Sequence, residues 1–211
     1  MEAKNTKGME ERIIEAAKQV FVRKGYVAAT MSDVANEVGI GRTALHYYYR
    51  TKEILFDAVF DQLLSSFLPN IDRVLDQECT IIEKLPSLID IYMNVIRANP
   101  SFPQFVVGEL NRDRNHVFQT VLKNPETIRP VLRLRQQIEE EMEKGLIRKI
   151  PVVDLLTTVV SLAVFPMLIR EPLQDLFMNQ SPKQFEEFLE RRKELIIETA
   201  IQLITPNSNQ V

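Results

Sequence analysis

Apolar residues recur at helical spacing along nearly the whole chain. In the first predicted helix, residues 9–24, the side chains of Ile13, Ala17 and Phe21 fall on one stripe. Residues three and four apart share a helix face, so this spacing predicts an amphipathic helix. The chain has no Asn-Gly, Asp-Gly or Gly-Gly pair and no sustained two-residue alternation, which are the signals of β-hairpins. The pattern therefore predicts an all-α protein, with no internal repeat of fixed period.

Two short helices joined by a glycine-containing turn are predicted near the N-terminus. Thr30 begins the first of them, and Asp33 follows three residues later in an arrangement that resembles a capping box. Gly39 ends that helix, and a second helix starts after Gly41 and covers residues 42–48. Two such helices with a tight turn between them form a helix-turn-helix unit.

Longer helices are predicted in the rest of the chain, with an irregular stretch within residues 111–125 and a connector at 171–181. We expect a helix-turn-helix domain at residues 9–54, a larger helical domain at 55–205, and flexible tails at 1–8 and 206–211. The expected later helices cover residues 52–67, 80–98, 103–112, 127–144, 152–170 and 182–203.

Composition indicates a globular cytoplasmic protein. The chain has 211 residues, of which 45% are apolar, and its single cysteine, Cys79, cannot form an internal disulfide. The first residues are polar and mixed in charge, so no signal peptide is expected. The apolar stretch 152–169 contains Asp154 and Pro166, and we interpret it as a buried helix rather than a membrane span.

Charge is distributed unevenly, although the net charge is only −3. Residues 1–54 contain nine Lys or Arg and seven Asp or Glu, whereas the remaining residues contain 17 and 22. The stretch 38–52 has no acidic residue, and it carries His46 and three consecutive tyrosines that end at Tyr49. A locally acid-free patch of cations and rings favours an anionic partner, and double-stranded DNA fits a helix-turn-helix.

The second helix of such a unit lies in the DNA major groove. In the 42–48 helix, Leu45 is expected to face the core, together with Tyr49 four residues on. Packing of the tyrosines in the core and plain solvation of the polar residues remain alternative interpretations. The opposite side presents Arg42, Thr43, Ala44, His46, Tyr47 and Tyr48.

The stretch TMSDVANEVGIGRTALHYYYRTKEIL resembles the N-terminal domain of the TetR family of bacterial transcriptional regulators. The resemblance is close over residues 9–60 and otherwise rests on helix layout and length. It implies a sequence-specific, ligand-responsive regulator, and it favours a repressor that binds a palindromic operator as a dimer.

The resemblance implies roles for individual residues. Lys52 matches a lysine that contacts a DNA phosphate, and Tyr47 and Tyr48 match positions that touch the backbone or bases. Gly41 replaces a usual capping serine, and Ala44 and His46 also depart from the family pattern, at positions where the operator sequence would be read. The expected DNA-binding set is Thr30, Ser32, Arg42, Thr43, Ala44, His46, Tyr47, Tyr48 and Lys52.

The last two long helices are expected to form a homodimer. The 152–170 helix is apolar on almost all sides, and the 182–203 helix has apolar residues on two flanks, so a second copy would cover what one chain leaves exposed. TetR-like proteins use their last two helices in this way. The expected interface residues are Leu162, Phe185, Phe188, Leu189, Ile196, Ile197 and Ala200.

The resemblance implies a small effector between the middle helices, and we expect it to be largely apolar, although core packing or solvation is the more common explanation for each candidate residue. The alternative is an architectural or co-regulatory DNA-binding dimer that a protein partner controls without a small molecule. An enzyme is not expected, because we find two histidines and no phosphate-binding loop, metal-ligand spacing or nucleophile elbow; neither a cofactor nor a metal is predicted. The candidate effector residues are Phe67, Tyr92, Phe105, Glu109, His116, Met142 and Phe165.

Overall fold

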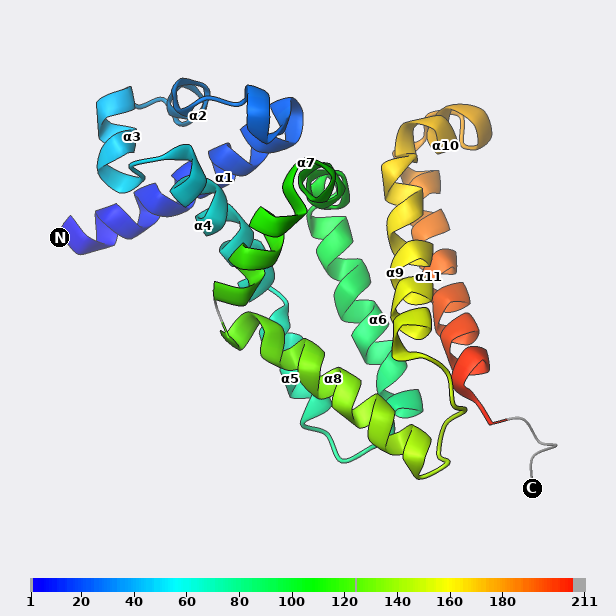
Figure 1. Ribbon diagram of the computed structural model, residues 1–211. Coiled ribbons are helices and arrows are strands. Elements are labelled where there is room, and N and C mark those ends of the chain that lie inside the picture. The colour runs from blue at the N-terminus through cyan, green and yellow to red at the C-terminus, as the bar shows by residue number, and fades with distance from the viewer. Residues whose placement is uncertain (1, 124, 207–211) are drawn as a thin grey trace. The chain divides into compact units, whose positions relative to one another are not determined.

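The computed structural model describes residues 2–123 and 125–206, and within this part it contains eleven helices and no strand (Figure 1). The expected all-α class is confirmed. The helices are α1 (Glu2–Ala28), α2 (Met31–Val38), α3 (Arg42–Tyr48), α4 (Lys52–Ser65), α5 (Leu68–Leu75), α6 (Ile81–Ala98), α7 (Phe102–Lys123), α8 (Pro125–Glu143), α9 (Val152–Leu168), α10 (Arg170–Phe177) and α11 (Pro182–Ile204).

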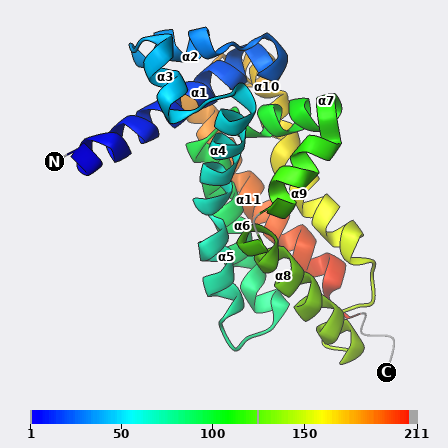
Figure 2. The same ribbon diagram turned by 60° about the vertical axis from the view of Figure 1, so that its left-hand side comes forward.

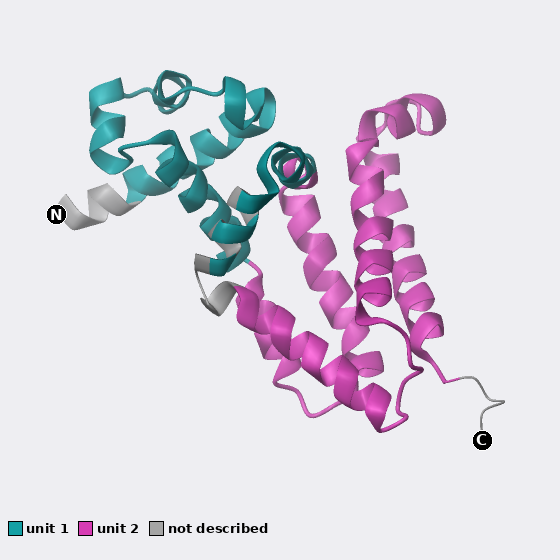
Figure 3. Cartoon of the chain, in the orientation of Figure 1, with its two compact units in different colours: residues 1–66, 104–125 teal, residues 67–103, 126–211 magenta. Residues whose placement is uncertain are grey.

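The chain divides into two compact units (Figure 3). Unit 1 comprises residues 1–66 and 104–125, and unit 2 comprises residues 67–103 and 126–211. The division differs from the expected boundary after residue 54, because α4 packs against α1 and because α7 contributes an aromatic side chain to the same core. The ring of Phe105 lies 5.2 Å from that of Phe56 and 6.4 Å from that of Phe21.

Local hydrogen bonds explain where the helices of the predicted helix-turn-helix begin and end. The Thr30 hydroxyl accepts from the backbone N–H of Asp33 at 3.1 Å, while the Asp33 carboxylate accepts from the backbone N–H of Thr30 at 2.9 Å. This is a complete capping box. Gly39 ends α2 with a φ of 80°, which favours glycine, and its N–H donates to the Ala35 carbonyl. The turn and both helices lie where the sequence predicts them.

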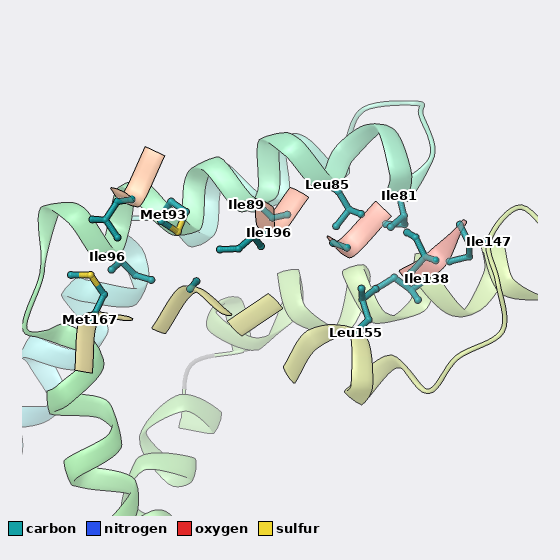
Figure 4. Packing of buried hydrophobic residues seen from close by; sticks show 14 of the residues in the cluster. Ile81, Leu85, Ile89, Met93, Ile96, Ile138, Ile147, Leu155, Met167 and Ile196 are labelled. Atoms are coloured by element: carbon teal, nitrogen blue, oxygen red, sulfur yellow. The ribbon is translucent and has the colours of Figure 1, made fainter. Parts of the chain in front are cut away.

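Unit 2 is built around α6, α9 and α11. Figures 1 and 2 show α9 and α11 side by side, and α6 packs against both. Ile89 and Met93 of α6, Leu155 and Met167 of α9, and Ile196 of α11 are all at most 4% exposed and belong to one hydrophobic cluster (Figure 4). Burial of these aliphatic side chains is the main stabilising contribution to this unit.

Two buried charged residues connect α5, α6 and α8. The Glu141 carboxylate accepts from the backbone N–H of Ile81, the first residue of α6, at 3.0 Å. The Lys84 ammonium donates to the Leu75 carbonyl and to the Gln137 side chain, both at 2.9 Å. Because buried charges must be paired or hydrogen-bonded, these contacts give Lys84 and Glu141 a structural role.

Several elements differ from the sequence prediction. The helix expected at 52–67 ends at Ser65, and an unexpected helix, α5, follows with Pro69 in its first turn, where the missing N–H of proline costs no hydrogen bond. The expected connector after residue 170 contains α10, and α7 continues on both sides of a non-helical residue, Asp113. The expected N-terminal tail is helical from Glu2 onward, and residues 207–211 of the expected C-terminal tail lie outside the described residues.

Within the described residues, no single helix has the length and apolar character of a membrane span. Only α9 and α10 taken together meet that criterion, and the two are bent by 67°.

Candidate nucleic-acid interface

The structure separates the residues of α3 into a buried and an outer side. Leu45 is fully buried, as expected, and fixes the helix on the core of unit 1. Arg42, Thr43 and Ala44 are exposed, and Tyr47 is 83% exposed. Arg42 and Tyr47 are thus exposed together on a side of α3 that lacks acidic residues, which favours an anionic binding partner.

The three tyrosines occupy different environments. The rings of Tyr47 and Tyr48 meet edge to face at 5.4 Å, and Tyr48 is half-buried. Tyr49 ends α3 and is also half-buried, and this burial raises the pKa of its hydroxyl. Only Tyr47 therefore projects freely, while Tyr48 supports it from the side.

The acidic side chains of α2 are paired with lysine or arginine. Asp33 accepts from the Lys24 ammonium at 2.7 Å, and Glu37 forms an ion pair with Arg23. The hydrogen bonds from Lys24 and Thr30 lower the pKa of Asp33 to about 2. The negative charges of Asp33 and Glu37 are thus compensated by neighbouring cations, which leaves the outer side of α3 suited to a polyanion.

The first residue of α3 is connected to its last turn by a chain of hydrogen bonds. The Nε–H of Arg42 donates to Nε2 of His46 at 3.2 Å. Nδ1 of the same ring lies 3.0 Å from the carbonyl oxygen of Arg50. His46 is half-buried, so the ring lies on the helix surface rather than projecting from it.

Lys52, the predicted phosphate contact, is held by unit 1 itself. Its ammonium donates to the backbone carbonyls of Tyr26, Ala29 and Val27 at 2.7, 2.8 and 3.3 Å. These bonds occupy all three N–H donors of the ammonium. They also fix the start of α4 against the end of α1 and the connector to α2, which is a contact that the sequence prediction missed.

The ring of Tyr26 contacts two cations, a feature that sequence reasoning also missed. The Lys52 ammonium lies 4.4 Å from the centre of its ring, and the Arg112 guanidinium of α7 lies 4.2 Å away. Arg112 in turn donates to the buried carboxylate of Glu109 at 2.7 Å. The three elements α1, α4 and α7 are far apart in sequence, so no local pattern signals that these side chains meet.

The other two candidate contacts lie at the start of α2. The Thr30 hydroxyl is occupied within the capping box, since it also donates to the Asp33 carboxylate at 2.8 Å. Ser32 is half-buried in the first turn of α2. Thr30 therefore has a demonstrated structural role, and contact of either residue with DNA stays a prediction.

Two protein-family profiles match most of this chain. The profile described as "Bacterial regulatory proteins, tetR family" matches residues 13–59, and the profile "Tetracyclin repressor-like, C-terminal domain" matches residues 82–200. The chain belongs to the TetR family. The resemblance stated from the sequence is thereby confirmed, and the chain is a DNA-binding transcriptional regulator by family.

Individual relatives within the TetR family are distant. The nucleoid occlusion factor SlmA of Vibrio vulnificus (strain YJ016) is 20% identical over 191 residues, which cover 88% of this chain and 94% of that protein. A crystal structure of the transcriptional regulator FadR from Bacillus subtilis with stearoyl-CoA has a TM-score of 0.68 at 16% identity, and it covers 90% of this chain and 97% of the other. The regulator PfmR from Thermus thermophilus has a TM-score of 0.65 at 20% identity, and the match covers 89% of this chain and 97% of the other. The solved structures support the TetR fold alone.

The candidate effector residues are distributed over both units. In unit 1, Phe105 lies in the aromatic core and Glu109 is paired with Arg112. The His116 side chain lies outside the described residues. The other four candidates, Phe67, Tyr92, Met142 and Phe165, belong to unit 2.

Those four residues of unit 2 also occupy different environments. Tyr92 packs on the hydrophobic core, where burial raises the pKa of its hydroxyl to about 12, and Phe67 precedes α5. Met142 lines a groove of about 440 Å³ beside Pro151. Phe165 is 58% exposed on α9. An effector site at these residues stays a prediction.

Part of the predicted dimer interface is wrong. The side chains of Phe185, Leu189, Ile196 and Ala200 are at most 1% exposed and pack inside unit 2. A partner subunit cannot reach them, because α11 directs this face toward α6 and α9. The error arose because both flanks of α11 are apolar, and helical periodicity alone does not tell which flank faces the protein's own core.

The outer side of α9 and α11 retains apolar residues. Leu162, Phe188 and Ile197, also predicted at the interface, are half-buried. Sequence reasoning missed several residues that are more exposed on these two helices. They are Val153 at 61%, Val160 at 44%, Phe165 at 58% and Leu195 at 46%.

Proposed function

We propose that this TetR-family chain acts as a homodimer that binds a palindromic operator and represses transcription. The outer side of α3 carries the proposal, because it exposes Arg42 and Tyr47 in a segment without acidic residues. In this arrangement Arg42, Thr43 and Ala44 face base edges, while Tyr47, Tyr48 and Lys52 face the sugar-phosphate backbone. Base contacts supply sequence preference and phosphate contacts supply register.

Apolar residues on the outer side of α9 and α11 support dimerisation through these two helices. Val153, Val160 and Leu195 are apolar and exposed in the monomer, and a second copy related by a two-fold axis would cover them. Two copies of α3 would then meet successive major grooves, which requires an inverted repeat with half-sites one helical turn apart.

The first experiment is selection of bound duplexes from a random DNA pool, with the full chain at about 0.15 M salt. Enrichment of an inverted repeat is the expected result. Arg42→Ala should select a pool with one relaxed position in each half-site, whereas Lys183→Ala, at an exposed lysine of α11, should select the parent sequence. Binding without any enriched sequence would contradict operator recognition.

We further propose that a small, largely apolar effector controls operator binding. FadR, which shares the fold, is named in complex with stearoyl-CoA, and this supports ligands with a long apolar chain. An effector releases DNA only if it binds the DNA-free conformation more tightly than the DNA-bound one. Addition of stearoyl-CoA to a complex with the selected operator should lower the anisotropy of labelled DNA, whereas coenzyme A alone should not.

Control by a protein partner is the second candidate function. The similarity to SlmA, which is named a nucleoid occlusion factor and not a ligand-responsive regulator, extends over 88% of the chain and is the observation that favours control without a small effector. Under this alternative, apolar ligands leave operator affinity unchanged, and the DNA-bound dimer recruits another protein. Operator binding that resists a panel of acyl-CoA and fatty-acid ligands would support the partner-controlled function over the effector-controlled one.

A further inference from the structure

His46 uses both of its ring nitrogens within the protein. Nδ1 lies 3.0 Å from the Arg50 carbonyl oxygen, and Nε2 lies 3.2 Å from Nε of Arg42. A carbonyl oxygen can only accept a hydrogen bond, so Nδ1 carries the proton. The Nε–H of arginine can only donate, so Nε2 is the unprotonated acceptor. The two contacts together require the neutral ring with its proton on Nδ1.

This arrangement determines which donors of Arg42 remain for DNA. A guanidinium has five N–H groups, and the contact with His46 occupies the one on Nε. The four N–H groups on the two terminal nitrogens remain, and they form the planar fork that can bind O6 and N7 of a guanine. A side-on approach of the guanidinium to guanine needs the N–H on Nε, so it is excluded while that N–H donates to His46.

The same contacts limit what His46 can do directly. Both polar atoms of its ring are engaged, and the side chain is half-buried beside the exposed Tyr47. Arg42 is one turn away, at the start of α3, where the recognition helix meets base edges. A flexible arginine loses rotamer freedom when it binds a base, so a contact that fixes it beforehand lowers this entropic cost.

We propose that His46 is a positioning residue for operator recognition, which orients the Arg42 guanidinium end-on toward a guanine instead of contacting DNA itself. The inference rests on the proposed function, since it requires that Arg42 reads a base. It assigns the operator preference to a pair of residues in which Arg42 supplies the donors and His46 determines their direction.

A double-mutant cycle tests the proposal with the 211-residue chain and the operator obtained by selection. The variants are Arg42→Ala, His46→Phe and the double variant, each measured on the operator and on a duplex with the guanine replaced. Arg42→Ala should remove a guanine preference of roughly 10- to 100-fold. His46→Phe should lose about 3- to 10-fold of that preference, and the double variant should match Arg42→Ala alone, because the residues act as one unit.

His46→Gln serves as the conservative control. Glutamine offers one acceptor and one donor on a side chain that helices tolerate well, so it should restore most of the guanine preference that His46→Phe loses. If the His46 ring only filled space, His46→Gln would not restore the guanine preference. The thermal unfolding midpoint of each variant confirms that it is folded, and His46→Gln keeps the test available should His46→Phe be unstable.

The outcomes separate the two claims. If Arg42→Ala leaves the base preference unchanged, the proposed reading by Arg42 fails. If Arg42→Ala abolishes the preference while His46→Phe retains it, the positioning role of His46 is overturned and base reading by Arg42 stands. Additive losses in the double variant would instead show that His46 contacts DNA independently, which also overturns the proposal.

Discussion

The Lys52 ammonium uses all three of its N–H donors within the fold, so a DNA phosphate nearby would meet its charge rather than a free N–H group. Three carbonyl groups at the end of α1 and in the connector to α2 accept from its ammonium. Lys52→Ala leaves them without this donor, so we expect a loss of about 1–3 kcal/mol in the free energy of unfolding. Urea denaturation of the DNA-free protein measures this loss, and Lys183→Ala is the control for removal of an exposed lysine charge.

The phosphate role of Lys52 makes a separate prediction. Each neutralised phosphate contributes a slope of about −0.9 to the dependence of log K on log salt concentration, so Lys52→Ala should reduce the slope by about 1 per subunit on any duplex. An unchanged slope together with reduced stability would leave Lys52 with the structural role alone. The sequence predicted the position of this lysine but not its carbonyl partners, because they lie 23–26 residues away.

Asp33 should make the start of α2 sensitive to acid. Its pKa is lowered from 3.8 to about 2 in the folded protein by hydrogen bonds from Lys24 and Thr30. A depressed pKa stabilises the fold above the unfolded value near 4, and this contribution is lost as the pH falls through about 2. Asp33→Asn should therefore lower the thermal unfolding midpoint at pH 7. The difference in midpoint between this variant and the parent should shrink as the pH falls from 4 to 2. A constant difference across that window would contradict the assignment.

At the scale of single helices, two glycines beside α2 and α3 should respond oppositely to serine. Gly41 caps α3 at a φ of −69° without a side-chain hydrogen bond, and a Cβ atom there would meet nothing within 4 Å. Gly41→Ser should stabilise the protein by about 0.5–1 kcal/mol through an added cap and a less flexible unfolded chain. Gly39→Ser should destabilise it by about 1 kcal/mol, since its φ is 80°. Urea midpoints compare the two, and stabilisation of both would contradict the role given to backbone conformation.

Helix boundaries were predictable where a local signal determines them. Thr30 and Thr80 form capping hydrogen bonds at the starts of α2 and α6, and Gly39 ends α2 shortly before α3 begins. These boundaries lie where the sequence predicts them. The sequence prediction missed α5 and α10, which are only eight residues long and each carry a proline in the first turn, where proline is tolerated. The inward and outward sides of α11 depend on tertiary packing, which the sequence pattern alone does not show.

At the scale of the whole molecule, the candidate site illustrates the same limit. The exposed residues of α3 were predictable from one short stretch, because Leu45 marks the buried side of a helix with a known role in its motif. The Arg112–Tyr26–Lys52 contact was not predictable, because it joins three helices that are brought together only in the folded chain. Recognition residues thus follow from local sequence, whereas the contacts that fix the domain around them follow from the tertiary fold.

Two adjacent residues of α11 should separate folding from dimerisation. Ile196 is fully buried, so Ile196→Glu places a charge in the core of unit 2 and should cost at least about 3 kcal/mol of stability. Leu195 is 46% exposed on the outer side, and Leu195→Glu should alter the stability of the monomer by less than about 1 kcal/mol. It should nevertheless dissociate the dimer, because two like charges would meet across the two-fold axis.

Val131→Glu is the matched control for Leu195→Glu, because Val131 is 48% exposed on α8, away from the proposed interface. Light scattering with far-UV circular dichroism should find the Leu195 variant folded and monomeric, the Val131 variant folded and dimeric, and the Ile196 variant unfolded or aggregated. A Leu195 variant that stays dimeric would place the interface elsewhere. Because a monomer presents only one α3, the folded Leu195 variant should also lose most of its operator affinity while keeping weak, salt-sensitive binding to any duplex.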